Sequence, residues 1–149
     1  MGNNQIVFAS PSEKVTIIKR VWRENNQAYL DLFIGDIDST GQIINKRSLN
    51  GEVNRSLHEA MVTFSKDFKT VYFSANNYDD EEKIIRSTTG LGNVQLYKAS
   101  VNENGEWIDI QKLPFNSNEF QTGLPTLNKD ETKLYFVSDR PESIGKTDI

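Results

Sequence analysis

The sequence contains no cysteine and only one histidine among its 149 residues. Without cysteine there are no disulfide bonds, no thiolate nucleophile and no zinc site built on thiolates, although the cellular compartment stays open. His58 is the only imidazole that a catalytic triad can use, and no G-x-S-x-G turn displays a serine. We therefore expect a protein that is not an enzyme and that carries no cofactor and no metal ion.

Long apolar runs and an excess of positive charge are also absent. No run approaches the ~18 apolar residues of a spanning helix, so we expect no transmembrane segment in this chain. Lysine and arginine number 17 against 21 acidic residues, and a formal net charge of −4 argues against nucleic acid as a partner. The first residues lack the pattern of a secretory signal, which leaves open a cytoplasmic protein or a leader outside this chain.

What the sequence does contain is an internal repeat. A short run rich in β-branched and aromatic residues and ending in serine occurs three times, at 6–10, 71–74 and 134–138. A second series, Leu32-Phe33, Gly41 and Leu49, returns 64 positions later as Leu96-Tyr97, Gly105 and Leu113, whereas Tyr72 and Tyr135 are 63 apart. Such self-similarity at a fixed period is the mark of a repeat architecture.

The repeated runs read as strands, and no segment keeps the apolar stripe of a helix, so the sequence predicts an all-β fold with little helix beyond a turn around 80–86. Polar residues 79–93 read as an insertion between two strands. Residues 15–22 are predicted to form an extra hairpin arm with 29–34. Asn104-Gly105 predicts a type I′ turn, in which both residues have positive φ.

These residues resemble the TolB-type, WD40-like β-propeller repeats, and in particular the propeller region of OmpA-family envelope proteins of the Bacteroidota. The stretches that carry the resemblance are Leu134–Pro141 (LYFVSDRP), His58–Ser65, Asn76-Asn77-Tyr78 and Leu113–Ser117. The sequence departs from it in two places: Phe68 and Glu131 replace the turn glycine that follows aspartate, and Glu142-Ser143 replaces a Gly-Gly pair after Pro141. The first departure concerns turn geometry. Those turns must therefore avoid positive φ or be strained.

The resemblance implies β-propeller-like, four-stranded antiparallel blades, about two and a half of them in an incomplete ring, with units near 1–57, 58–121 and 122–149. It implies a binding or scaffolding module in the periplasm or at the outer membrane. Its partners there would be envelope proteins, including peptidoglycan-associated or secretion components. An incomplete ring leaves strand edges exposed, so self-association is a further expectation. The alternatives are the accessory propeller of a larger hydrolase, such as a prolyl-oligopeptidase-like peptidase, and a carbohydrate-binding propeller.

Four residues are candidates for ligand or partner contacts. His58 with Glu59 can bind a ligand or sense pH, but we favour a structural role at the start of an inner strand. Asp139 and Arg140 follow a buried strand, which would place them at the rim of a propeller blade, where propellers bind ligands. The slightly favoured alternative is that Asp139 and Arg140 form a pair that fixes their loop to a neighbouring blade. Asp36 and Asp38 match part of a calcium-binding loop, but a hairpin turn is the better interpretation of this segment.

Overall fold

The chain is built from antiparallel β-sheets. The computed structural model describes residues 4–13, 21–22 and 26–149, and this part of the chain contains strands and turns but no helix. This part of the chain therefore contains no helix that is long and apolar enough to cross a membrane. The strands are β1 (Gln5–Pro11), β2 (Val21–Trp22), β3 (Gln27–Ala28), β4 (Leu30–Ile37), β5 (Ile43–Ser48), β6 (Glu59–Phe64), β7 (Thr70–Asn76), β8 (Val94–Val101), β9 (Trp107–Lys112), β10 (Thr122–Leu127) and β11 (Leu134–Ser138).

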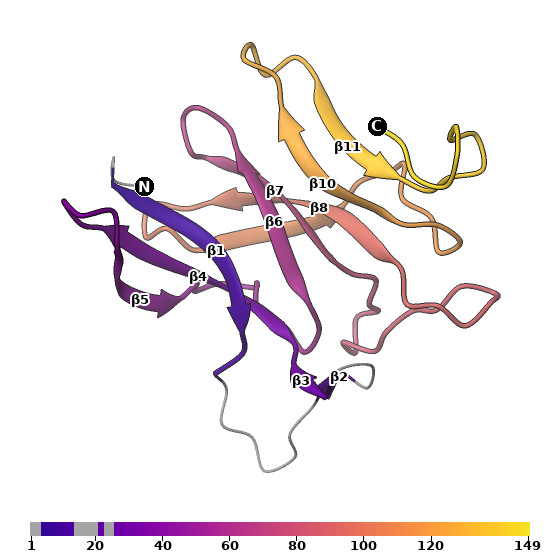
Figure 1. Ribbon diagram of the computed structural model, residues 1–149, viewed down its shortest axis with the longest axis horizontal. Coiled ribbons are helices and arrows are strands. Elements are labelled where there is room, and N and C mark those ends of the chain that lie inside the picture. The colour runs from indigo at the N-terminus through magenta and orange to yellow at the C-terminus, as the bar shows by residue number, and fades with distance from the viewer. Residues whose placement is uncertain (1–3, 14–20, 23–25) are drawn as a thin grey trace.

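Three sheets follow one another along the chain (Figure 1). The first has the order β1-β4-β5, the second β6-β7-β8-β9 and the third β10-β11, while β2 and β3 form a separate short hairpin. Strand β6 packs against β1 and β4 of the first sheet, and β10 packs against β6, β7 and β8 of the second. The all-β prediction is confirmed, and one sheet has the expected four strands. The placement of these sheets as blades of a ring stays a prediction.

The sequence repeat corresponds to a repeat of backbone hydrogen bonds. The Leu49 N–H donates to the Leu32 carbonyl at 3.1 Å, and the Leu113 N–H donates to the Leu96 carbonyl at the same distance. The first bond ties the segment after β5 to β4, and the second ties the segment after β9 to β8. The period read from side-chain identities therefore describes the same backbone arrangement in successive sheets.

Even the irregularities of the sheets recur. Met61 in β6 and Leu124 in β10 lie at β-bulges and have φ angles of 46° and 55°. Asn45 in β5 and Asp109 in β9 lie at a second pair of bulges with φ angles of 52° and 54°. Bulges bend a strand and increase its twist. Successive sheets consequently share their local curvature as well as their strand order.

The turns between paired strands contain residues with positive φ, the left-handed backbone conformation. Phe68 and Glu131 both have a φ of 57°, so the turns that lost glycine keep the positive φ and are strained rather than reshaped. The type I′ prediction at Asn104 is wrong, because only Gly105 has positive φ (77°) in that turn. The Gly105 N–H donates to the Asn102 carbonyl, which makes a longer turn closed by one left-handed residue.

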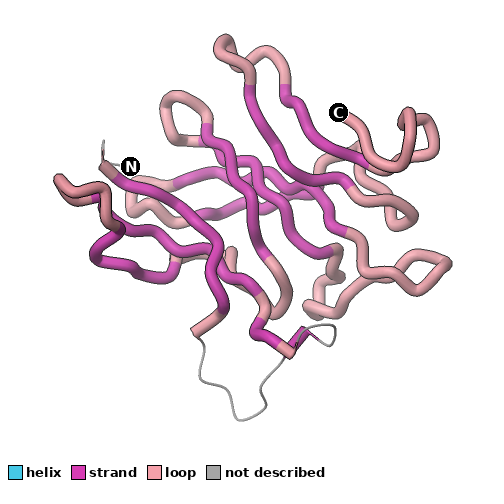
Figure 2. The backbone as a smooth tube through the Cα atoms, in the orientation of Figure 1, coloured by secondary structure: helices cyan, strands magenta, loops and turns pink. Residues whose placement is uncertain are grey.

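The two long connections differ from each other. Residues 77–93 link β7 to β8 and contain no strand of the sheet, as predicted (Figure 2). A helical turn was expected around 80–86, but Asp79–Glu82 instead form a tight turn that closes a hairpin-like loop. The predicted arm is wrong in its pairing, because β4 pairs with β1 and only the short β2 and β3 pair with each other. Its residues 15–20 lie outside the described part of the chain.

The core is an array of aromatic rings on the second sheet. Trp107 is 1% exposed and packs against Phe64 and Phe73, with ring centroids 5.8 Å and 5.3 Å away. Tyr97 stacks between Phe73 and Tyr78 at 5.5 Å and 5.2 Å. Aromatic pairs at these separations contribute energy beyond the area that they bury. Trp107 is therefore a packing residue, and the second sheet carries the buried aromatic core of the described residues.

Candidate functional site

A groove of about 350 Å³ lies between the second and third sheets. Its walls come from β6, β7 and the start of β8 on one side and from β10, β11 and the residues beside them on the other. The lining residues are Ala60, Met61, Ser74, Val94, Gln121, Gly123, Leu124, Val137, Ser138, Asp139 and Thr147. Because β6 and β10 are equivalent strands of the repeat, the groove separates two copies of one structure.

Two exposed apolar side chains mark the edges of this groove. Met61 is 56% exposed and Leu124 is 49% exposed, and both are held in the left-handed conformation at their bulges. The Leu124 N–H donates to the Ser74 Oγ at 3.0 Å, which fixes the bulge of β10 against β7. Backbone strain of this kind costs of order 1–3 kcal/mol and is concentrated at sites where geometry matters for binding. The strained bulges therefore direct apolar side chains to a hollow on the surface.

Asp139 lines the groove and also fastens the third sheet. Its Oδ1 accepts the Gln121 N–H at 2.6 Å, a contact that closes the end of the β10–β11 hairpin. In the second sheet the Asn76 Oδ1 accepts the His58 N–H at 3.1 Å in the same way. Gln121 is the residue before β10, so this contact joins the two ends of the hairpin. That Asp139 and Arg140 hold their loop against a neighbouring blade stays a prediction. The carboxylate stays exposed beside the groove.

Arg140 does not pair with Asp139. Its guanidinium lies between the rings of Phe120 and Phe136, 5.4 Å and 5.3 Å from their centroids, and its Nε donates to the Ser138 Oγ at 3.4 Å. Its Nη2 is buried and has no hydrogen-bond partner among the described residues. A buried guanidinium donor without an acceptor is costly. Arg140 is therefore positioned by aromatic packing rather than by a carboxylate.

His58 and Glu59 lie at the start of β6 and outside the groove lining. The His58 Nδ1 accepts the Leu30 N–H at 3.0 Å, and its ring meets the Tyr29 ring edge-on at 4.7 Å between centroids. Burial lowers the pKa of His58 below its ordinary value, since the charged form loses water. Glu59 is 1% exposed and accepts the Arg55 N–H at 3.1 Å. Both residues join the second sheet to the chain that precedes it.

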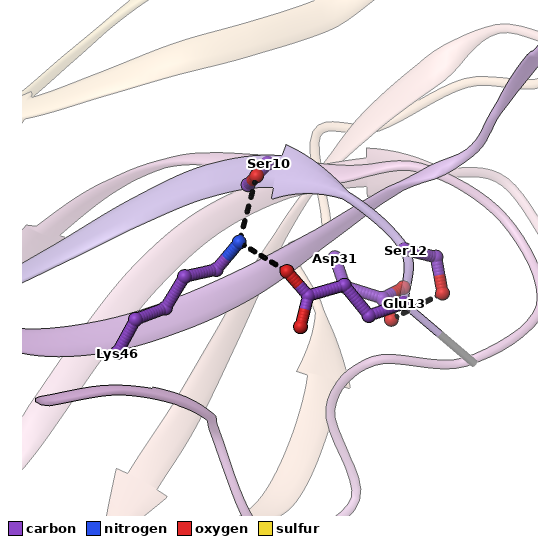
Figure 3. Close-up of polar contacts among 5 residues, drawn as sticks. All are labelled: Ser10, Ser12, Glu13, Asp31 and Lys46. Carbon is purple, nitrogen blue, oxygen red and sulfur yellow. Dashed lines mark hydrogen bonds and ion pairs between the residues drawn. The ribbon is translucent and has the colours of Figure 1, made fainter.

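A separate polar cluster ties the first sheet together (Figure 3). Lys46 in β5 reaches across β4, where its Nζ lies 4.0 Å from the centroid of the Phe33 ring, to donate to the Ser10 Oγ at 3.1 Å and to pair with Glu13 at 2.6 Å. The nearby Ser12 hydroxyl donates to the buried Asp31 at 2.7 Å. These contacts hold β1, β4 and β5 in place, and the sequence analysis missed them.

The described residues provide no cluster of three or more histidine or acidic side chains that would hold a metal ion. The Asp38 carboxylate instead accepts the Thr40 N–H, the Thr40 hydroxyl and the Gln42 N–H within its own turn. These bonds lower the pKa of Asp38, with the Thr40 hydroxyl as the largest contribution. The hairpin interpretation of this acidic segment is therefore the one that the geometry supports.

Sequence reasoning placed one of the four candidates, Asp139, in the groove and missed its apolar edges. Met61 and Leu124 are 63 residues apart, the same spacing as Tyr72 and Tyr135, so the repeat contained a signal for them.

In comparisons with known proteins, no family model, no curated protein and no solved structure matches this chain.

Proposed function

We propose that the chain is part of a β-propeller-type binding module that contacts protein partners in the envelope of a Gram-negative bacterium. The observation that carries the proposal is the groove between two equivalent hairpins of a repeated antiparallel sheet. Propellers and other repeat folds bind partners where successive units meet at a shared surface. The envelope location comes from the sequence resemblance described above.

The chemistry of the groove suits an apolar side chain of a protein partner. Met61 and Leu124 offer exposed apolar surface at its edges, while Asp139 and Gln121 supply polar groups beside it. Protein interfaces combine a small desolvated apolar centre with a polar rim in this manner. A methionine also adapts its shape to different partners because its side chain is unbranched.

The setting of His58 supports binding rather than catalysis. A general base needs a ring nitrogen that can accept a proton. Because the His58 Nδ1 accepts the Leu30 N–H, the neutral ring carries its proton on Nε2, so neither nitrogen is set up to act as the base. Its ring also packs on Tyr29 instead of facing the groove. His58 and Glu59 therefore act as supports for the sheet that forms one wall of the groove.

Site-specific photocrosslinking in intact Gram-negative cells tests the proposal. A photoreactive residue at position 124, at the edge of the groove, is expected to give adducts with periplasmic or outer-membrane proteins. The matched control is position 91, where Leu91 is 62% exposed in the long loop and outside the groove lining. The additional change Met61→Glu should reduce the adducts from position 124, because it places a charge against the apolar edge.

Two results would contradict this function. One is crosslinking from position 91 that is as strong as that from position 124, or adducts with cytoplasmic proteins alone. The other is hydrolysis of an ester, peptide or glycan substrate by the purified protein that disappears in His58→Ala, which would show an enzyme.

A further inference from the structure

Asp139 is the only charged residue that lines the groove between the second and third sheets. Its Oδ1 accepts the Gln121 N–H, and the carboxylate forms no ion pair with a lysine or arginine of the described chain. The cation next to it in sequence, Arg140, lies between two aromatic rings instead. The groove therefore presents an uncompensated negative charge to whatever enters it.

The polar groups of the groove gather at one end. Gln121 and Asp139 lie just beyond the last residue pair of the β10–β11 ladder. Thr147 precedes the residue that bridges to Ser138, so it reaches the same end. The side chains of these three lining residues offer a carboxylate, a carboxamide and a hydroxyl oxygen, all of which accept hydrogen bonds. This end is suited to a group that donates several hydrogen bonds and carries a positive charge.

The remainder of the groove is largely apolar. Leu124 and Val137 line it from the β10–β11 hairpin, and Met61 and Val94 line it from the second sheet. Its volume of about 350 Å³ is near the lower end of the range for ligand pockets, about 300–1,000 Å³. The groove is thus sized for one side chain with an apolar stem and a cationic head, and lysine and arginine are the residues of that kind.

The hydrogen bond that Asp139 already accepts separates these two. Arginine pairs best with a carboxylate through two parallel bonds, one to each oxygen. At Asp139 one oxygen already accepts the Gln121 N–H, which interferes with that arrangement. A lysine ammonium is a compact charge with three donors, so it can combine one carboxylate oxygen with neutral acceptors such as those of Gln121 and Thr147.

We propose that the groove binds a lysine side chain of the partner protein, with the ammonium group at Asp139 and the methylene stem along Met61 and Leu124. The proposal rests on the binding function proposed above and names the residue by which the partner is recognised. Met61 and Leu124 contact the stem and the apolar surface around it. A charge at position 61 therefore disturbs the partner's apolar contacts, as the crosslinking experiment expects.

NMR titration of the full 149-residue chain with Nα-acetyl-lysine amide at low ionic strength tests the proposal. We expect saturable shifts of the Gly123 and Leu124 amide resonances, which report on the groove lining. Nα-acetyl-norleucine amide has the same kind of unbranched stem without the ammonium group. It should bind at least ~10-fold more weakly, since the charge-assisted hydrogen bond is lost. Nα-acetyl-arginine amide should also bind more weakly than the lysine amide.

Asp139→Asn separates the charge from the fold. The asparagine Oδ1 still accepts the Gln121 N–H, but the negative charge is gone. Binding of the lysine amide should weaken at least ~10-fold, whereas binding of the norleucine amide should stay unchanged. The matched control is Asp130→Asn, which removes the same charge from an exposed turn outside the groove lining and should leave lysine binding unchanged. The same spectra show whether each variant is folded.

The proposal is wrong if the lysine amide does not bind or shifts only resonances outside the groove. It is also wrong if the norleucine amide binds as tightly as the lysine amide, if the arginine amide binds more tightly, or if Asp130→Asn weakens binding as much as Asp139→Asn. Each of these failures leaves the crosslinks from position 124 in place, since a partner without a lysine still contacts the groove. Absent crosslinks together with intact lysine binding would instead contradict the proposed function in the envelope.

Discussion

Nine residues other than glycine hold positive φ angles in the described part of the chain, and they include the large side chains of Met61, Phe68 and Leu124. The left-handed conformation costs roughly 1–2 kcal/mol for an ordinary L-residue. Met61 and Leu124, which bear this cost, line the groove. Phe68 lies in an exposed turn and is not part of the groove lining, so the strain there has no evident role in binding.

Phe68→Asn should therefore stabilise the protein, by about 0.5–1 kcal/mol, because asparagine tolerates positive φ better than phenylalanine does. The gain is smaller than the full strain, since the tilted contact of Phe68 with Phe64 at 6.0 Å is lost. Urea unfolding measures the change. Lys66→Asn in the same turn is the control and should bring no gain, because Lys66 does not have positive φ. Equal stabilisation by both variants would show that strain is not the cause.

The burial of His58 predicts a pH dependence of the protein's stability. Its folded-state pKa is lowered by burial from the ordinary value of 6.5, so the unfolded chain takes up the proton first. Its contribution to stability is then complete above pH ~6.5 and is lost as pH falls from there through the folded-state pKa. The charged ring also places an N–H against the Leu30 N–H, which breaks that bond.

Urea midpoints at pH 7.5 and 5.5 should consequently differ in the wild type. His58→Gln should flatten this difference, because the amide oxygen still accepts the Leu30 N–H and does not titrate; glutamine also stands at the equivalent position, Gln121. Since His58 is the only histidine, no other imidazole contributes in this range. An unchanged difference in the variant would contradict this assignment.

At the scale of elements, the asparagines that follow β5 and β9 bind the backbone of β4 and β8, respectively. The Asn54 Oδ1 accepts the Leu32 N–H at 2.6 Å and its Nδ2 donates to the Leu32 carbonyl at 2.8 Å. Asn116 does the same for Leu96, at 3.0 Å and 2.7 Å. Each side-chain amide thus imitates the backbone of a neighbouring strand and satisfies both groups of a buried leucine.

Asn116→Ala should cost about 1–3 kcal/mol of stability, because it leaves the buried Leu96 N–H without a partner and removes one of the two bonds to the Leu96 carbonyl, which keeps the Leu113 N–H. Asn116→Asp should fall in between, since the carboxylate accepts the N–H but offers no donor to the carbonyl. Asn104→Ala, at an exposed turn position with no side-chain hydrogen bond, is the matched control and should be nearly neutral. Urea unfolding orders the three variants, and an equal loss in Asn104→Ala would contradict the assignment.

These elements also show what the sequence could predict. The strands and the repeat were readable, because buried β-branched and aromatic runs recur at 63 and 64 residues. The bulges at Met61 and Leu124 were not, because apolar residues carry no local signal for positive φ and the register of the whole sheet imposes it. Arg140 was paired with Asp139 by adjacency, whereas Asp139 accepts the Gln121 N–H and Arg140 lies against aromatic rings, contacts that depend on residues distant in sequence.

At the scale of the whole molecule, the described chain behaves as a row of similar sheets in which each contacts its neighbours. In such arrays stability is a sum of contributions from units and from their interfaces. The second sheet holds the fully buried aromatic array and is flanked on both sides. The first and third sheets each have one such neighbour, and among the described residues the outer edge of β11 pairs only with Asp148.

Amide hydrogen exchange of the free chain should show this difference at single equivalent residues. Phe73 and Phe136 occupy the same position in the repeat, but the Phe73 N–H faces β8 while the Phe136 N–H faces the open edge. Phe73 should therefore exchange slower by several orders of magnitude, because its exchange requires opening of the central sheet. The backbone N–H groups of Tyr72 and Tyr135 both face a partner strand, β6 and β10 respectively. These two amides serve as controls, and both should be protected. Equal protection of Phe73 and Phe136 would mean that an unrecognised segment covers β11, and the open edge would have to be abandoned as a property of this chain.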